Sequence, residues 1–310
     1  MEALLAKDYP SDKLEIIIID DGSNDRTVAN VQELMAGTTI LKLIEAPQLT
    51  TGFAPKKNAL LAGIAASTGE VILTTDADCK PGPEWVSGMV SCFEEGTVAV
   101  VGYSPVSGGI AAFDAFVNGV ISAGSIGLGK PTTAVGRNFA YRREAFEAIG
   151  GFGKTIQGAS GDDDLLLQRF ATSGGKVAFA VGPATFVPAT GAETFGDWLT
   201  MKRRHLSAGT RYSPSLVGIF VVLYFFHAGL IASVITSLAN QTSWWLPASI
   251  WGMKVIADWA TLQKGAEILH QKGWFGGWLV AEIVSPFLVV FITPFALVGK
   301  VNWKGRKLKR

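Results

Sequence analysis

The sequence predicts an α/β domain built on a doubly wound, mostly parallel sheet, followed by C-terminal transmembrane helices. Three apolar runs are predicted as strands, at residues 15–20, 40–44 and 71–75. Two predicted helices, 27–35 and 57–67, lie between them, and this β-α-β-α-β alternation is typical of doubly wound sheets. Residues 214–299, in contrast, are dominated by Leu, Ile, Val, Phe and Trp, as expected of membrane helices.

Composition excludes some classes of function. The chain of 310 residues has a net charge of +1, so no basic surface predicts nucleic-acid binding. Only 17% of residues are charged and the mean hydropathy is +0.31, which is unusually apolar for a soluble protein. Two cysteines, Cys79 and Cys92, are too few for a disulfide framework and lack the spacing of metal ligands. A reduced, cytoplasmic setting is therefore predicted for the first two-thirds of the chain.

An acidic pair follows the third predicted strand, in the run Asp76-Ala77-Asp78. Two carboxylates on a loop that leaves a buried strand can converge on one hard cation, and Mg²⁺ and Mn²⁺ prefer such oxygens together with substrate phosphates. Ligands of doubly wound sheets bind at this end of the strands. The alternative is a solvated turn without chemistry.

A second acidic cluster, Asp162-Asp163-Asp164, precedes the apolar run 165–167, where a helix is predicted to begin. Three successive carboxylates repel one another, which raises at least one pKa toward the range useful for a general base. The alternative is an acidic helix N-terminus that only complements the helix dipole.

Four stretches together resemble the inverting family 2 glycosyltransferases with the GT-A fold. They are IIIIDDGSNDRT (16–27), KKNALLAGIAASTGEVILTTDADC (56–79), GRNFAYRREAFEAIGGF (136–152) and GDDDLLLQR (161–169). Their order and spacing agree with the family over roughly residues 1–212. The resemblance implies transfer of a sugar from a nucleotide-sugar donor, with UDP the expected nucleotide, and dependence on Mg²⁺ or Mn²⁺.

The resemblance also implies roles for donor-binding residues. Asp20 and Asp21 are expected to bind the nucleobase or ribose of the donor, and Lys57 to contact the donor. Asp76 and Asp78 resemble the DxD pair, with Asp78 expected to contact the metal directly. For Lys57, a solvated lysine at a helix start is the alternative.

Three further segments carry roles by resemblance. The loop Gly136-Arg137-Asn138 is expected to line the sugar and acceptor site, or alternatively to form a simple turn before the helix 143–149. Asp162 is expected to be the general base, and Asp163 takes that place if the register differs by one residue. Arg204, in the run 201–205, resembles an arginine that faces the diphosphate. The alternative for 198–207 is an amphipathic helix at the lipid surface.

The sequence predicts a catalytic domain over residues 1–200, an interfacial basic linker over 201–213 and a membrane domain over 214–310. Full spans are expected at about 215–239 and 274–299. The segment 244–262 carries Lys254 and Asp258, and is expected to be interfacial or re-entrant, or a third span. The basic tail 300–310 should remain cytoplasmic together with the catalytic domain, which favours an even number of crossings.

Family members normally begin with another central strand, so the resemblance implies that this chain lacks its first strand. The expected location is the cytoplasmic membrane, as a multi-pass protein, with a cell-envelope, lipid-linked or polysaccharide acceptor. Two alternatives stay open at this point. One is a catalytically inactive partner of an intact transferase, and the other is a sugar nucleotidyltransferase.

Overall fold

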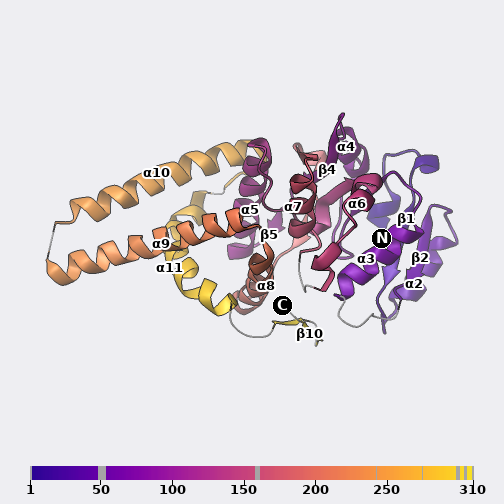
Figure 1. Cartoon of the computed structure of the whole chain (residues 1–310). Helices are drawn as coiled ribbons and strands as arrows, with labels where there is room; N and C mark the ends of the chain where they lie inside the picture. The colour runs from indigo at the N-terminus through magenta and orange to yellow at the C-terminus, as the bar shows by residue number, and fades with distance from the viewer. Residues whose placement is uncertain are drawn as a thin grey trace.

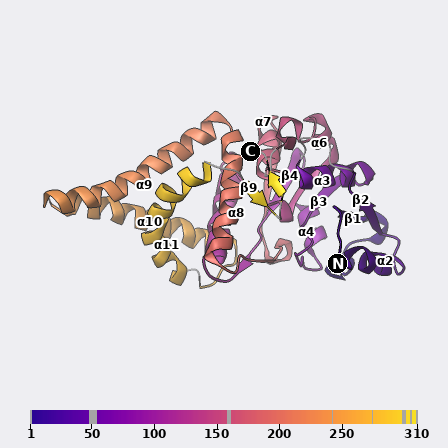
Figure 2. The ribbon, with the colours of Figure 1, turned by 90° about the horizontal axis from the view of Figure 1, so that it is seen from below.

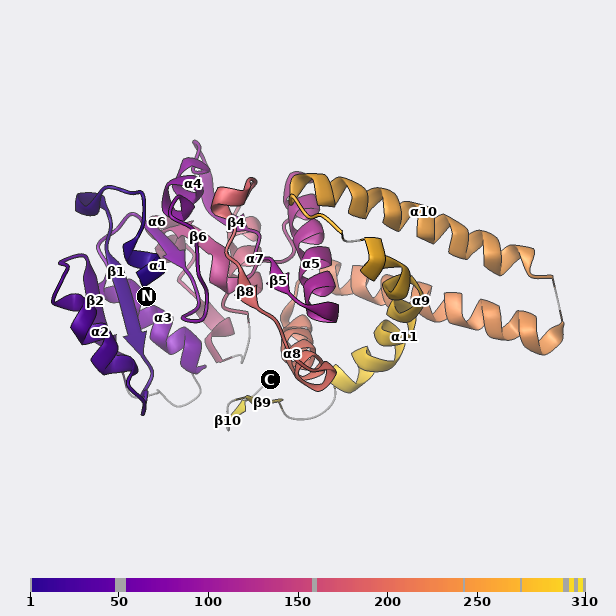
Figure 3. The same ribbon diagram turned by 180° about the vertical axis from the view of Figure 1, so that it is seen from behind.

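The computed structural model describes residues 2–47, 54–157, 161–241, 243–273, 275–297, 301–303 and 306–308. An α/β part lies at one end of an elongated molecule, and three long helices extend from the other (Figure 1). The helices α5 and α8 lie between these two parts, as the views from below and from behind both show (Figure 2, Figure 3).

The elements of the α/β part follow one another along the first two-thirds of the chain. They are α1 (Glu2–Leu5), η1 (Ser11–Lys13), β1 (Ile16–Asp20), α2 (Thr27–Met35), β2 (Leu41–Glu45), α3 (Pro55–Ala66), β3 (Val71–Thr74), α4 (Trp85–Ser91), β4 (Thr97–Gly102), β5 (Val106–Ser107), α5 (Gly109–Gly127), η2 (Gly136–Asn138), β6 (Phe139–Arg142), α6 (Arg143–Ala148), η3 (Gly153–Gln157), α7 (Asp164–Thr172), β7 (Lys176–Ala180), η4 (Pro183–Thr185) and β8 (Ala189–Thr190). The remainder comprises α8 (Phe195–Ala208), η5 (Gly209–Arg211), α9 (Pro214–Asn240), α10 (Trp245–Ile268), α11 (Phe275–Leu297), β9 (Val301–Trp303) and β10 (Arg306–Leu308).

The main sheet has four strands in the order β3-β6-β4-β7. β4 and β7 are parallel, but β6 runs antiparallel to both β3 and β4. The α/β class is therefore confirmed, whereas the main sheet is mixed rather than mostly parallel. The prediction rested on the alternation of the first 75 residues, and β6 enters the sheet far downstream of that alternation.

Both faces of the main sheet are covered by helices, and successive residues of a strand point to opposite faces. On β6, Phe139 and Tyr141 pack with Phe170 of α7 on one face. Ala140, between them in the chain, packs with Trp85 and the rest of α4 on the other face. This two-sided core confirms the doubly wound arrangement and fixes the loops that leave the strand ends.

β1 and β2 form a separate parallel pair, with Ile16 opposite Leu41 and Asp20 opposite Glu45. Within the described residues, β1 and β3 each have a single ladder partner. The Glu15 carboxylate connects the two sheets instead, since it accepts a hydrogen bond from the Gly69 backbone N–H at 2.9 Å and pairs with Lys42 at 2.8 Å.

The C-terminal helices expose long apolar faces. By length and composition, α9, residues 276–294 of α11 and also α5 are apolar enough to cross a membrane. Side chains such as Val222, Phe225 and Phe226 on α9 are exposed, which suits lipid rather than water. α5, however, connects β5 to β6, and the short segment between α5 and β6 leaves no length for a return crossing.

The segment expected at 244–262 forms α10, a continuous helix of 24 residues alongside α9 (Figure 1). It is not among the helices of the described residues that are apolar enough to cross a membrane, and its place relative to the lipid stays a prediction. The predicted pair is present, because Lys254 Nζ lies 2.7 Å from Asp258 and also 2.5 Å from Glu282 of α11. Of the predicted span 274–299, both ends lie outside the described residues, as does part of the tail 300–310.

Asn138 is fully buried at the junction of η2 and β6. Its amide group donates to the carbonyls of Tyr103 and Thr185, both at 2.8 Å, and accepts from the Trp85 ring N–H at 2.9 Å. Because all three partners lie on different segments, this one side chain connects β4, α4 and η4.

We therefore expect Asn138→Ala to lower the free energy of unfolding by about 2–4 kcal/mol, since several buried polar groups lose their partners. Thermal unfolding of the purified protein in detergent measures this loss. Asn30→Ala, on the exposed face of α2, is the matched control and should change stability little. Equal melting temperatures for the two variants would contradict the role of Asn138.

Candidate active site

Three segments, namely the loop after β3, η2 before β6 and the loop before α7, meet at the ammonium group of Lys56. Lys56 Nζ lies 3.0 Å from Asp76 Oδ1, on the loop after β3, and 2.8 Å from Asp162 Oδ2, just before α7. Lys56 itself stands in the first turn of α3. The predicted metal carboxylate and the predicted general base are thus brought together by a lysine that the sequence analysis did not single out.

The backbone of Gly136 lies close to both Asp162 and Lys56. A Cβ atom here would lie 3.0 Å from Asp162 Oδ2 and 3.2 Å from Lys56 Nζ, so a side chain would push against both groups. The Gly136 carbonyl accepts a hydrogen bond from Thr74 Oγ1 at 2.7 Å. Its N–H donates to Asp163 Oδ2 at 2.8 Å. Glycine therefore lets η2 pack directly against the acidic loop.

The three successive carboxylates have three different sets of partners. Asp162 pairs with Lys56, whereas Asp163 accepts from the N–H groups of Gly136 and Asp164, each at 2.8 Å. Asp163 is thereby the N-cap of α7. Asp164 accepts from Leu165 N at 2.8 Å and from the Tyr212 hydroxyl. Two of the carboxylates thus hold the loop in place, and Asp162 faces the lysine.

The pKa values of the three groups diverge accordingly. Burial favours the neutral form of Asp162, but the charge and hydrogen bond of Lys56 outweigh it and lower its pKa below the ordinary value. Burial and the neighbouring Asp162 charge raise the pKa of Asp163. Burial, followed by the charge of Asp163, raises the pKa of Asp164 to about 8. Asp162 is therefore ionised at neutral pH, as a general base must be.

The predicted donor residues Asp20 and Asp21 follow one another at the end of β1. The Asp20 carboxylate accepts from the Ser23 N–H at 3.1 Å and so fixes the turn, and Asp21 is exposed beyond it. Asp20 is the last residue of β1 and lies opposite Glu45, the last residue of β2. The chain continues from this end of β2 to α3, which carries Lys56. These two residues therefore lie at the expected edge of the fold.

Two predicted site residues turn inward instead. Lys57 is only 1% exposed, and its ammonium donates to the Thr155 carbonyl at 2.5 Å. Asn138 is fully buried in the contacts described above. Adjacent residues on a helix point about 100° apart, so the sequence alone could not tell which of the two lysines, 56 or 57, faces the acidic loops.

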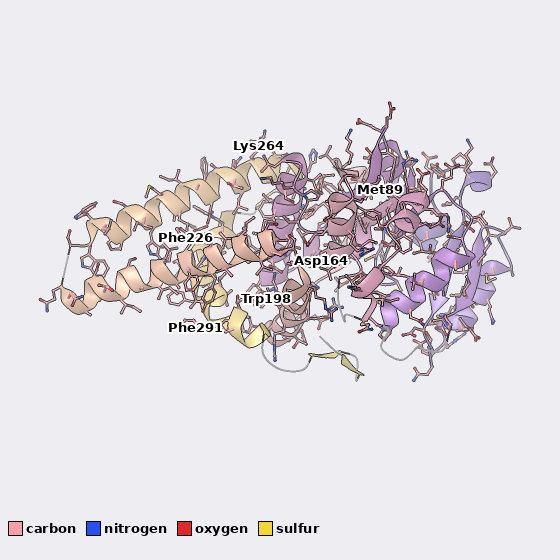
Figure 4. The ribbon with its side chains drawn as sticks, viewed as in Figure 1. Met89, Asp164, Trp198, Phe226, Lys264 and Phe291 are labelled. Carbon is pink, nitrogen blue, oxygen red and sulfur yellow. The ribbon has the colours of Figure 1, made fainter. Side chains whose placement is uncertain are left out.

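Basic residues of η2 and α8 lie near the cluster. Arg137 Nε donates to Ser104 Oγ at 2.5 Å, which holds its side chain beside the end of β4. Arg204, on α8, lies 3.1 Å from the ring of His205. The charges of Arg137 and Asp162 both act on His205, so the middle of α8 stands beside the site. Asp164, at the start of α7, and Trp198, in α8, both lie where the α/β part meets the long helices (Figure 4).

A divalent cation fits the oxygen donors of this cluster. Asp76 and Asp162 already enclose an ammonium group, and carboxylate oxygens are the ligands that Mg²⁺ and Mn²⁺ prefer. Asp78 lies two residues after Asp76 and is exposed. The described part of the chain contains no group of three metal-ligating side chains, so a bound ion would need further oxygens from a ligand.

Comparison with known proteins identifies the family of the N-terminal part of the chain. The sequence model of the family described as Glycosyl transferase family 2 matches residues 1–150. The chain therefore contains a glycosyltransferase family 2 domain. It is 29% identical over 214 residues to the probable glycosyltransferase YdaM of Bacillus subtilis, covering 66% of this chain and 50% of that protein. It is also 28% identical over 143 residues to the dolichol-phosphate mannosyltransferase of Pyrococcus furiosus, covering 44% and 39% of the two chains.

Among solved structures, the chain resembles the mannosyltransferase PcManGT of Pyrobaculum calidifontis, in complex with GDP-Man and Mn²⁺. The TM-score is 0.59 at 20% identity, and the match covers 96% of this chain and 81% of the other. This likeness confirms the GT-A type of fold. The match spans half or less of the length of YdaM and of the dolichol-phosphate mannosyltransferase.

The raised pKa of Asp164 predicts a pH dependence of stability. Between about pH 4, the ordinary pKa of aspartate, and about pH 8, the folded protein keeps a proton on Asp164 that the unfolded chain has lost. The contribution of this group to stability is therefore fully present below about pH 4, and it is lost as the pH rises toward 8. Asp164→Asn should reduce the fall in melting temperature between pH 5 and pH 8.

The control for this experiment is Asp12→Asn, an exposed aspartate of η1. It should leave the wild-type pH dependence intact. Identical pH dependence in the Asp164→Asn variant and the wild type would show that this carboxyl group is ionised in the folded protein.

Proposed function

We propose that this chain transfers a sugar from a nucleoside-diphosphate donor to an acceptor hydroxyl or phosphate at a membrane surface, with inversion at the anomeric carbon. The observation that carries the proposal is that the carboxylates of Asp76 and Asp162 both contact one positive charge, the ammonium group of Lys56. The family 2 domain over residues 1–150 and the exposed apolar faces of α9 and α11 support it.

In the proposed reaction, Asp162 acts as the general base. Its carboxylate accepts the proton of the acceptor hydroxyl while the acceptor oxygen bonds to the anomeric carbon of the sugar. The bond from that carbon to the diphosphate oxygen breaks on the opposite face, and its electron pair leaves with the nucleoside diphosphate. The lowered pKa of Asp162 keeps this base ionised at neutral pH.

Asp76 and Asp78 would hold a divalent metal ion, Mg²⁺ or Mn²⁺, together with the donor phosphates. When bound, such an ion offsets the negative charge that develops on the leaving diphosphate. Arg204 of α8 is proposed to face the diphosphate from the other side, and Arg137 to contact the sugar or acceptor. Asp20 and Asp21 are proposed to bind the nucleoside.

We propose a UDP-sugar as the donor, with a GDP-sugar as the second candidate because PcManGT is described in complex with GDP-Man. A lipid-linked acceptor is favoured by two features. One is the similarity to a dolichol-phosphate mannosyltransferase, and the other is the contact of Tyr212 with Asp164, which joins the acidic loop to the segment that leads into α9. The proposed setting is the cytoplasmic face of the membrane, where nucleotide sugars are made.

The proposal predicts that Asp162→Asn lowers the transfer rate by about 10²–10⁴-fold, since it removes the general base. Donor affinity should stay close to that of the wild type, because Asp162 is not assigned to the donor. Radiolabelled sugar transfer from UDP- and GDP-sugars into a lipid extract measures the rate, and calorimetry measures the affinity.

Asp163→Asn is the matched variant for this experiment. It should keep more of the rate than Asp162→Asn and lose more stability, since Asp163 caps α7. A larger rate loss in Asp163→Asn would assign the base to that residue instead. Release of pyrophosphate without sugar transfer would indicate a nucleotidyltransferase.

A further inference from the structure

Lys56 occupies the position between two carboxylates that are proposed for different tasks. Asp76 belongs to the loop proposed for the metal, and Asp162 is the proposed base. Its ammonium lies within 3.0 Å of both, so a single positive charge holds the two loops together. A divalent ion on Asp76 and this ammonium would compete for the same carboxylate, because both need its oxygens.

We propose that Lys56 is a positioning residue that serves as a resident cation in the donor-free enzyme. In that state its ammonium holds Asp76 and Asp162 at the spacing required for catalysis. When the metal-bound donor arrives, Lys56 releases Asp76 and keeps its contact with Asp162. This inference rests on the function proposed above and adds a step that precedes the chemistry.

The surroundings of Lys56 favour such an exchange. Its side chain is 45% exposed, and Asp76 is 38% exposed, so an ion from solvent can reach their contact. Asp162 is 11% exposed, so the second contact is the more enclosed of the two. The close approach of Gly136 also limits movement of Lys56 toward η2. The exposed contact is therefore the one that opens first.

The neighbouring lysine does not share this role. Lys57 is buried and donates to the Thr155 carbonyl, on the side of the core that contains Phe152. Its ammonium is thus held by the protein interior, and Lys56 is the lysine whose ammonium pairs with Asp76 and Asp162. This division separates a lysine that supports the fold from a lysine that acts in the site.

The test measures Mn²⁺ binding to the full chain in detergent without nucleotide, by electron paramagnetic resonance. Lys56→Gln removes the competing charge, so it should bind Mn²⁺ roughly two- to fivefold more tightly than the wild type, the range expected for a partly exposed ion pair. The gain should disappear in Lys56→Gln/Asp76→Asn, because the ion then lacks its carboxylate. Lys176→Gln, which breaks an exposed pair with Glu94, is the matched control and should leave Mn²⁺ affinity unchanged.

Three outcomes separate this inference from the proposed function. Tighter Mn²⁺ binding in Lys56→Gln that depends on Asp76 supports the resident cation. Unchanged or weaker Mn²⁺ binding in Lys56→Gln, with melting temperature preserved, overturns it, even where the wild type transfers sugar. If Lys56→Gln unfolds, Lys56→Met replaces it, because methionine fills a similar space without the charge: tighter Mn²⁺ binding than in the wild type supports the resident cation, and unchanged binding overturns it. Sugar transfer by the wild type tests the proposed function independently of all three.

Discussion

The ion pairs of Lys56 with Asp76 and Asp162 are the constraint on which the arrangement of the site depends. The carboxylates of Asp76 and Asp162 and the backbone of Gly136 meet at one position. Without a cation between them, the two carboxylates would repel each other. A lysine in the first turn of α3 removes that repulsion. The same charge lowers the pKa of Asp162, so one interaction both assembles the site and keeps its base ionised.

The loops themselves are held by the sheet beneath them. Asp163 caps α7 and binds η2 through the Gly136 N–H, and Asn138 ties η2 to the ends of β4 and α4. Residues expected to contact ligands therefore serve the framework. Asp163 is committed to these backbone contacts, and Asp162 is the carboxylate of the cluster that pairs with Lys56.

A second connection runs from the acidic loop to the long helices. Tyr212 donates to Asp164, and its ring lies 5.9 Å from that of Phe220 on α9. The segment that leads into the first apolar helix is thereby fixed against the loop that carries the base. In a membrane, this contact would set the height of the site above the lipid surface, which matters for an acceptor that is itself a lipid.

Much of this arrangement could be predicted from the sequence, because it depends on local patterns. The strand ends, the acidic pair at Asp76 and Asp78 and the start of α7 after Asp163 all follow from apolar runs and capping residues. The antiparallel direction of β6, the choice of Lys56 over Lys57 and the buried position of Asn138 could not be predicted. Each depends on contacts between segments far apart in the chain, which periodicity does not encode.

The most direct test of the central claim, a metal-dependent nucleotide-sugar site at these loops, is calorimetric titration of UDP and then GDP into the protein in detergent. The account predicts binding of one nucleotide with Mn²⁺, its loss with chelator and its loss in Asp78→Ala. No binding of either nucleotide by protein with an intact thermal transition would contradict the account. Binding that is unaffected by chelator would contradict the assignment of Asp76 and Asp78 to a metal.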